Sequence, residues 1–361
     1  MSGMSGMTGN RGEWSELYVF LKLLSQGLIY AADEKVGRID DIYYPILKIM
    51  REETKGEKTE YIIGDSEIEI MPDTGSSFSV ARERFEEYSR LLIGRIIKGG
   101  NRAFQVEEVA EFAEGIRVTK LKAPSADKTD IAMRIRDINT GYVRDVGFSI
   151  KSDLGSAPTL LNASHTTNFI YSVLGLDESK VREINSISGN DKIKARTAKI
   201  KEYGGMPKYR GMENAVFRRN LVMIDSCMPE IIGRMLLYSY FENERSVRTL
   251  VDVMGGEDAF GYGDRGMYEY KVKKFLSACA LGMRPARPWD GLDEANGGYI
   301  IVRKDGEVLV YYIYDRNSFE QYLLDNTELE RASTTRHGFM SLYEADGETF
   351  IKLNLQIRFR A

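Results

Sequence analysis

The segment from Thr129 to Lys151 constrains the fold of this chain most strongly, because its two apolar runs alternate as strands do. Every second residue is apolar from Ile131 to Ile135 and again from Val146 to Ile150. Side chains on a strand point alternately to its two faces, so each run has an apolar and a polar face. The residues between the runs, 137–142, have the composition of a hairpin turn. We therefore predict a β-hairpin with one polar face.

The register of this hairpin decides which polar residues meet. A two-residue loop at Asn139-Thr140 pairs Asp130 with Ser149 and Arg134 with Asp145. Side chains directly opposite each other lie about 5 Å apart. A bulge in the turn would shift the register by one residue and separate these pairs. The register is therefore a prediction that a structure tests.

In this register Asp130, Ser149 and Lys151 share the polar face. An acid that starts one strand, followed by an x-Lys at the end of the next, is the arrangement of a divalent-metal nuclease site. Mg²⁺ prefers oxygen ligands and needs only one or two protein carboxylates beside substrate phosphate, and Asp130 would supply one. Lys151 would stabilise charge on the scissile phosphate or position the attacking water.

A second acid is expected on an amphipathic helix predicted from Trp14 to Gly27. Glu16 shares a stripe with Phe20 and Leu24, which places its carboxylate at the edge of the buried face. An acid there either meets a cation or loses hydration at a cost. Glu13, one turn earlier, is a weaker candidate. The alternative for both acids is a solvated position in the first turn, where they complement the helix dipole.

The rest of the chain predicts an α/β (α+β) fold, a mixed sheet flanked by helices with helical and β-hairpin additions. Further helices are expected at 39–51, 78–97, 106–112, 228–243 and 268–282, with a strand at 60–70. Two Asp-Gly turns, at Asp305 and Asp346, predict C-terminal hairpins. The predicted organisation is a flexible leader (1–11), a core with the hairpin (12–176), a helical region (177–290) and a β-rich end packed on the core (291–361).

Charge and composition limit the function classes. The net charge of −4 does not suggest a nucleic-acid partner, yet residues 192–219 hold nine Lys and Arg against two Glu. Such a local surplus suits phosphate contacts, although a solvated helix face explains it equally well. The chain has only two histidines, His165 and His337, which weighs against Ser-His-Asp chemistry.

The cellular setting follows from the cysteines and the apolar stretches. Cys227 and Cys279 are the only cysteines, and each lies in an apolar segment. We expect buried thiols in a reducing cytoplasm rather than a disulfide or a zinc site. No stretch is apolar enough for a membrane span, and the N-terminus lacks the features of a signal peptide.

Several longer segments, taken in order, resemble the HpaII family of type II restriction endonucleases over nearly the full chain. They are Gly12-Glu13-Trp14-Ser15-Glu16-Leu17-Tyr18, Gly147-Phe148-Ser149-Ile150-Lys151-Ser152, Gly155-Ser156-Ala157-Pro158-Thr159-Leu160-Leu161-Asn162-Ala163-Ser164, Thr334-Thr335-Arg336-His337-Gly338-Phe339 and Lys352-Leu353-Asn354-Leu355-Gln356-Ile357-Arg358-Phe359. The resemblance implies a PD-(D/E)xK-type nuclease core and Mg²⁺-dependent double-strand DNA cleavage at a short GC-rich palindrome such as CCGG. It also implies a separate cognate methyltransferase.

The resemblance assigns roles to the hairpin residues. Asp130 takes the position of the motif's first acid, Lys151 that of its lysine, and Glu16 that of a first-helix glutamate. Ser149 departs from the pattern, which has Asp or Glu there. A hydroxyl cannot replace a carboxylate's charge, so Glu16 or Asp153 would complete the metal site.

Candidate DNA contacts are small polar residues after the catalytic strand and arginines suited to guanine. They are Ser152, Ser156, Asn162, Ser164, Arg196, Arg210, Arg218, Arg219, Arg336 and His337. For the four small polar residues, the alternative is a role in turn formation or helix capping. For Arg336 and His337, the alternative is a structural role at the start of a hairpin.

Two other functions stay open on the sequence alone. One is a less specific DNA-repair or mobile-element nuclease on the same core. The other is a catalytically decayed DNA-binding protein, which Ser149 suggests. A palindromic target favours a two-fold homodimer, and a monomer that nicks the strands in turn is the alternative.

Overall fold

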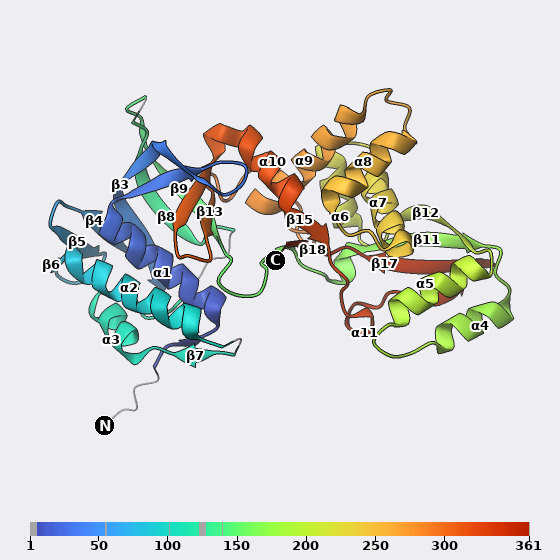
Figure 1. Ribbon diagram of the computed structural model, residues 1–361, viewed down its shortest axis with the longest axis horizontal. Coiled ribbons are helices and arrows are strands. Elements are labelled where there is room, and N and C mark those ends of the chain that lie inside the picture. The colour runs from blue at the N-terminus through green and yellow to red at the C-terminus, as the bar shows by residue number, and fades with distance from the viewer. Residues whose placement is uncertain (1–5, 55, 101, 123–127, 139, 361) are drawn as a thin grey trace. The chain divides into compact units, whose positions relative to one another are not determined.

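The computed structural model describes residues 6–54, 56–100, 102–122, 128–138 and 140–360. These residues form two compact units (Figure 1). Unit 1 comprises residues 1–158 and 293–319, and unit 2 comprises residues 159–292 and 320–360. The units cut across the predicted domain ranges, because residues 159–176 belong to unit 2 and the β-rich end is divided between both units.

Unit 1 is built on a mixed sheet of nine strands. Their order is β2 (Leu28–Ala32), β14 (Val308–Tyr312), β13 (Gly298–Val302), β9 (Val143–Ser152), β8 (Ile131–Arg136), β3 (Arg38–Thr54), β4 (Glu57–Ile63), β5 (Glu67–Pro72) and β6 (Phe78–Ala81). The pairs β13–β9 and β14–β2 are parallel and the others are antiparallel. The predicted hairpin lies inside this sheet, flanked by β3 and β13, so it is held on both sides.

Three α-helices lie wholly within the described part of unit 1. Helices α1 (Arg11–Gln26) and α2 (Arg82–Lys98) lie side by side, and α3 (Glu107–Gly115) packs beside α2 (Figure 1). A capping box formed by Asn10 and Glu13 starts α1, and Gly27 ends it in the left-handed conformation with φ 66°. The inner face of α1 is fully buried from Leu17 to Leu24 apart from Lys22. This burial fixes the rotation of α1 and therefore the direction of Glu16.

The predicted helix at 39–51 is wrong, because these residues belong to the long strand β3. Its first half pairs with β2 and its second half with β8 and β4. Pro45 would break a helix here, and the surrounding residues are rich in Ile and Tyr, which favour strands. The apolar spacing of residues 39–51 also fits a helix, but pairing of β3 with three strands determines the structure here.

Two further predictions had the wrong boundaries. The strand expected at 60–70 is two strands, β4 and β5, joined by a tight turn in which the Gly64 amide donates to the Glu67 carbonyl. The helix expected at 78–97 begins at Arg82, since 78–81 form the edge strand β6. Within the predicted leader, residues 1–5 lie outside the described part, and β1 (Thr8–Gly9) pairs with β7 (Phe104–Gln105).

Unit 2 contains two smaller sheets and most of the helices. The four-stranded sheet has the order β12 (Met206–Met212), β11 (Asn168–Leu174), β17 (Glu348–Asn354) and β16 (Leu342–Ala345), and the three-stranded sheet has the order β10 (Thr159–Leu161), β18 (Ile357–Phe359) and β15 (Thr327–Leu329). The helical elements are η1 (His165–Thr167), α4 (Glu178–Ser186), α5 (Lys192–Glu202), α6 (Ala215–Ile224), α7 (Met228–Glu242), α8 (Val247–Glu257), α9 (Arg265–Leu281) and α11 (Thr334–His337). η2 (Ile313–Asp315) lies in unit 1, and α10 (Arg316–Asn326) runs from unit 1 into unit 2.

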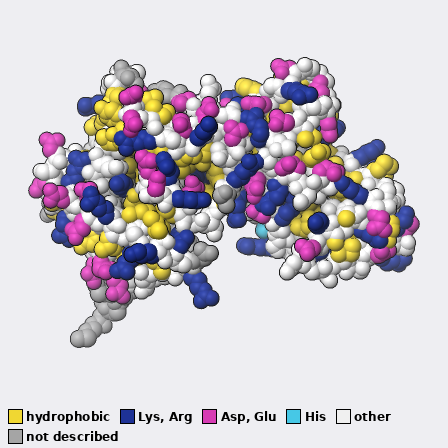
Figure 2. Space-filling view, viewed as in Figure 1, with side chains coloured by type: hydrophobic (Ala, Val, Ile, Leu, Met, Phe, Trp, Pro, Cys, Tyr) yellow, Lys and Arg dark blue, Asp and Glu magenta, His cyan; other side chains and the backbone are white. Residues whose placement is uncertain are grey.

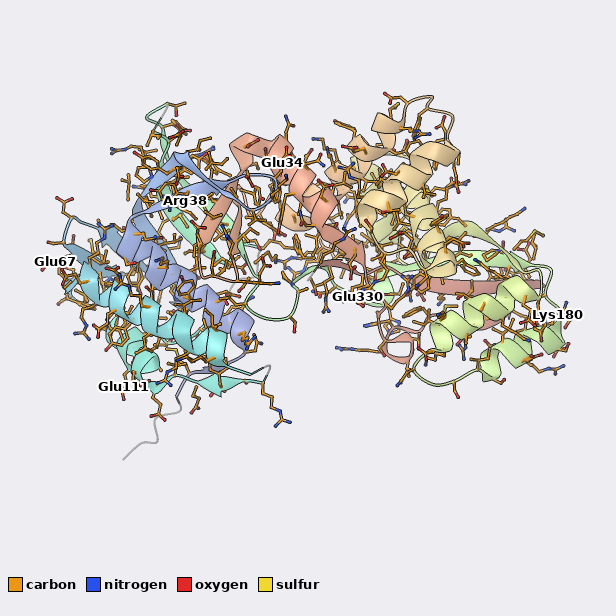
Figure 3. The ribbon with its side chains drawn as sticks, viewed as in Figure 1. Glu34, Arg38, Glu67, Glu111, Lys180 and Glu330 are labelled. Atoms are coloured by element: carbon orange, nitrogen blue, oxygen red, sulfur yellow. The ribbon has the colours of Figure 1, made fainter. Side chains whose placement is uncertain are left out.

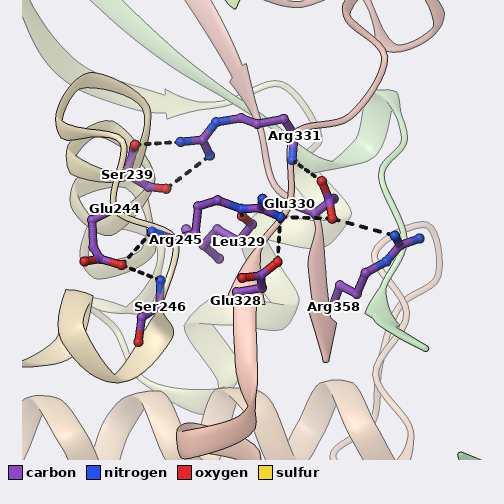
Figure 4. A network of polar contacts seen from close by, with 9 residues as sticks. All are labelled: Ser239, Glu244, Arg245, Ser246, Glu328, Leu329, Glu330, Arg331 and Arg358. Carbon is purple, nitrogen blue, oxygen red and sulfur yellow. Dashed lines mark hydrogen bonds and ion pairs between the residues drawn. The ribbon is translucent and has the colours of Figure 1, made fainter. Parts of the chain in front are cut away.

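A polar network ties β15 to the turn between α7 and α8 (Figure 4). Arg245 donates to Glu328 at 2.6 Å and to the Leu329 carbonyl at 3.1 Å, and it also pairs with Glu330 at 3.0 Å. Glu330 lies 3.7 Å from Arg358 as well. The network therefore joins β15, β18 and the α7–α8 turn within unit 2.

Several predictions for the second half of the chain are confirmed. The helices at 228–243 and 268–282 correspond to α7 and α9, and both Asp-Gly turns connect antiparallel strands. Cys227 and Cys279 are free thiols; Cys279 is buried and Cys227 is half-buried. Among the described residues, no helix is both long and apolar enough to cross a membrane.

Candidate active site

The hairpin register agrees with the prediction. Ile131 lies opposite Phe148, and Arg134 lies opposite Asp145. Arg134 donates twice to Asp145, at 2.6 and 2.8 Å. Asn139 of the predicted loop lies outside the described residues, and no bulge interrupts the ladder of β8 and β9.

Asp130 directly precedes β8 and is held by two donors. Its Oδ2 accepts from the Ser149 hydroxyl at 3.0 Å and from the Ile150 amide at 2.8 Å. Ser149 is 2% exposed, so its hydroxyl faces Asp130 and not solvent. Ser149 thus orients the carboxylate, and the second oxygen of Asp130 is left for other partners.

Glu16 reaches the same place from α1. Its side chain is only 13% exposed, and Oε2 is buried without a hydrogen-bond partner among the described residues. Burial, and next the charge of Asp130, raise the pKa of Glu16 to about 7. The expectation that Glu16 lies at the edge of the buried face agrees with this geometry. Glu13 instead caps α1, because it accepts from the Asn10 amide at 2.8 Å.

A second lysine, Lys122, joins the acids. Its Nζ lies 3.2 Å from Glu16 Oε1 and 3.7 Å from Asp130 Oδ1. Lys122 was not among the residues predicted for the site. It follows Lys120 in a segment without periodic pattern, so nothing in the sequence distinguishes it from a solvated lysine.

Lys151 completes the charged group. Its Nζ lies 5.4 Å from the centre of the Tyr299 ring on the neighbouring strand β13. Burial lowers the pKa of Lys151, while the charge of Asp130 acts in the opposite direction. The structure thus brings Glu16, Lys122, Asp130 and Lys151 together, from α1, the segment after α3, the start of β8 and the end of β9.

The residues present fit a single hard divalent cation. Among the described residues no group of three or more His, Cys, Asp or Glu could hold a metal, but Mg²⁺ needs only one or two carboxylates. Glu16 and Asp130 supply two, and the unpartnered Oε2 is an acceptor that a cation would satisfy. Asp153, the other candidate for the missing acid, interacts with Lys304, and burial raises its pKa. The structure therefore favours Glu16 over Asp153.

The predicted DNA contacts near β9 divide by environment. Ser152 donates to Ser15 on α1 at 2.9 Å, which ties β9 to the helix that carries Glu16. Ser156 is exposed in the turn after β9. In unit 2, Asn162 is exposed, and Ser164 caps η1 by accepting from the Thr166 amide.

The arginines predicted to read guanine also differ. Arg196 is 8% exposed, and its guanidinium donates to four oxygens, including the Ile187 and Met340 carbonyls, so it stabilises the fold. Arg210 pairs with Glu348 at 2.9 Å. Arg218 and Arg219 are exposed on α6. Arg210 is exposed as well, and Arg219 donates to the Trp289 carbonyl at 2.8 Å.

Arg336 and His337 lie on α11, next to η1. The rings of His337 and His165, the only two histidines, are 6.2 Å apart, and Arg336 is exposed. Burial, and next the charge of Arg336, lower the pKa of His337. We call these three residues the η1–α11 surface. Figure 2 shows a histidine with Lys and Arg side chains in this part of unit 2.

A buried amide network lies under this surface. Asn354 donates to the Ser164 carbonyl at 2.8 Å and to Asn168 Oδ1 at 2.7 Å. Asn168 in turn donates to the His337 carbonyl at 2.9 Å and to Glu213 at 2.7 Å. Both asparagines are fully buried. Through these donated hydrogen bonds, the two asparagines connect η1 and α11 to the sheet.

Comparison with known proteins identifies the family of this chain. The family model described as HpaII restriction endonuclease matches residues 10–359. The chain is 39% identical over 356 residues to the type II restriction enzyme HpaII of Haemophilus parainfluenzae, and the match covers 98% of each chain. No solved structure matches. The chain therefore belongs to the HpaII restriction endonuclease family and is a type II restriction enzyme that cleaves DNA at a specific sequence.

Proposed function

We propose that the enzyme makes Mg²⁺-dependent double-strand cuts at a short GC-rich palindrome such as CCGG, with a PD-(D/E)xK-type centre. The observation that carries the proposal is the meeting of Glu16, Asp130 and Lys151 on elements far apart in sequence. One lysine and two acids around a partly buried point are what metal-assisted phosphodiester hydrolysis needs.

Each residue has a defined part in this proposal. Glu16 and Asp130 would hold the cation, which supplies an activated water and offsets charge on the phosphate. Lys151 stabilises the negative charge that develops on the scissile phosphate. Ser149 and the Ile150 amide orient Asp130 through Oδ2 and leave Oδ1 available. Ser149 is thus a positioning residue at the place where the motif has an acid.

For DNA recognition we propose the η1–α11 surface. Arg336 is an exposed cation of the kind that reads guanine through two hydrogen bonds. His165 and His337 add ring donors beside it, and the buried amide network holds all three in place. Arg218 and Arg219, with Ser152, Ser156, Asn162 and Ser164, would contribute contacts to the DNA backbone.

Plasmid DNA incubated with Mg²⁺ tests the proposal, followed by sequencing of the ends. The expected result is cutting at one short palindrome by the wild type and none by Asp130→Asn or Lys151→Met. Glu111→Gln serves as a control, because Glu111 lies on the outer side of α3 (Figure 3). Ends scattered over many sequences, or no cutting with Mg²⁺, would refute the proposal.

The setting of the enzyme is part of the same proposal. We propose that it works in the cytoplasm beside a separate methyltransferase that protects the same sequence. A two-fold homodimer fits a palindromic target. Sedimentation with and without a duplex that carries the site distinguishes this dimer from a monomer.

A further inference from the structure

The ammonium of Lys122 lies where the proposed function would place a divalent cation. This ammonium lies between two carboxylates, 3.2 Å from Glu16 Oε1 and 3.7 Å from Asp130 Oδ1. Two partly buried acids that face each other in a low dielectric disfavour each other's charged forms, and positive charge from Lys122 and the nearby Lys151 offsets this. Lys122 therefore provides part of the charge compensation that a divalent ion would provide under the proposed function.

The side chain can leave without a change in the backbone. It is 55% exposed, whereas the two acids are each 13% exposed. The residues before it are fixed: Thr119 donates to Glu53 at 2.8 Å, and the Lys120 ammonium donates to the Glu53 carbonyl at 3.0 Å. A lysine has a flexible four-carbon stem, so its ammonium can swing into solvent while the segment stays in place.

We propose that Lys122 is a displaceable internal cation: it bridges Glu16 and Asp130 in the metal-free enzyme and leaves when a divalent ion binds. This inference rests on the proposed function, because it needs these two acids as the metal ligands. It goes further in assigning Lys122 a role in setting the metal affinity. The pair of contacts also explains how the acids stay aligned before the metal arrives.

Calorimetric titration with Ca²⁺ at pH 8 measures the competition. Lys122→Met removes the competing ammonium, so its affinity should rise roughly tenfold, the equivalent of about 1.4 kcal/mol. Lys120→Met is the matched control, two residues away and bound to Glu53 instead, and its affinity should equal that of the wild type. Unchanged or weaker Ca²⁺ binding by Lys122→Met would overturn the inference.

Amine labelling separates displacement from simple proximity. If Lys122 leaves the site, Ca²⁺ should make it react faster with an acylating reagent, while Lys120 in the same digested protein stays constant. Labelling of Lys122 that Ca²⁺ slows or leaves unchanged would contradict displacement. If Glu16→Gln and Asp130→Asn bind Ca²⁺ as the wild type does, the proposed metal centre itself fails, a different result from failure of the Lys122 variants alone.

Discussion

Glu16 offers the sharpest quantitative prediction, because its position makes the folded protein sensitive to pH. Its pKa rises from 4.5 to about 7 on folding, chiefly through burial. The folded protein therefore keeps this proton up to about pH 7, whereas the unfolded chain releases it near 4.5. Between these values the free energy of unfolding falls as the pH rises, at about 1.4 kcal/mol per pH unit for this group.

Ionisation of Glu16 should lower the free energy of unfolding by roughly 3 kcal/mol at pH 8 in the metal-free protein. Glu16→Gln keeps the shape of the side chain and removes the ionisation. We expect the variant to be more stable than the wild type by up to about 3 kcal/mol at pH 8 and about equal to it at pH 4.5. The same substitution should abolish cleavage, because a neutral amide cannot replace a metal-binding carboxylate.

Tryptophan fluorescence provides the assay. The chain has two tryptophans, and Trp14 is fully buried in α1 of unit 1. In a Trp289→Phe background, urea unfolding in the presence of a chelator reports on unit 1 alone. Glu111→Gln, which changes an exposed acid on α3, should track the wild type at each pH. The reasoning fails if the stability difference between Glu16→Gln and the wild type is the same at pH 5 and pH 8.

Three other substitutions test separate parts of the structure. Ser149→Ala removes the 3.0 Å bond to Asp130 but keeps that from the Ile150 amide, so single-turnover cleavage should slow roughly tenfold; a rate equal to wild type would contradict a positioning role. Asn354→Leu leaves Asn168 Oδ1 without its buried donor, which should lower the free energy of unfolding of unit 2 by about 1–3 kcal/mol. The variant should also discriminate less between cognate and non-cognate duplexes when binding is measured in Ca²⁺. Unchanged thermal unfolding would refute this structural role of Asn354. Glu330→Gln breaks ion pairs with Arg245 and Arg358, and we expect at most about 1 kcal/mol lost and normal cleavage; lost cleavage would show that this network serves the site.

The sequence predicted the parts of the site that regular structure positions. Strand alternation and turn composition placed Asp130 opposite Ser149, and the helical stripe placed Glu16 at the edge of the buried face; the structure agrees with both. The prediction of a helix at 39–51 was wrong because the apolar spacing in a short segment fits the period of a helix and that of a strand. Only the pairing partners of β3, which are distant in sequence, decide between them. The local sequence pattern therefore predicts the direction of a side chain when the helix or strand is assigned correctly. It cannot decide between helix and strand where pairing with distant strands determines the structure.

Lys122 marks the other limit, and it also explains why the site tolerates its acids. A residue in an irregular segment has no period from which its direction can be derived, so its contact with Glu16 emerges only from the path of the chain. Yet the two acids favour a cation beside them, because the burial of a charged carboxylate is costly, and Lys122 lies next to both of them. Burial raises the pKa of Glu16 to about 7, and the charge of Lys122 acts in the opposite direction. A half-exposed lysine is easier to displace than a buried one, so the 55% exposure of Lys122 fits the displacement that we propose.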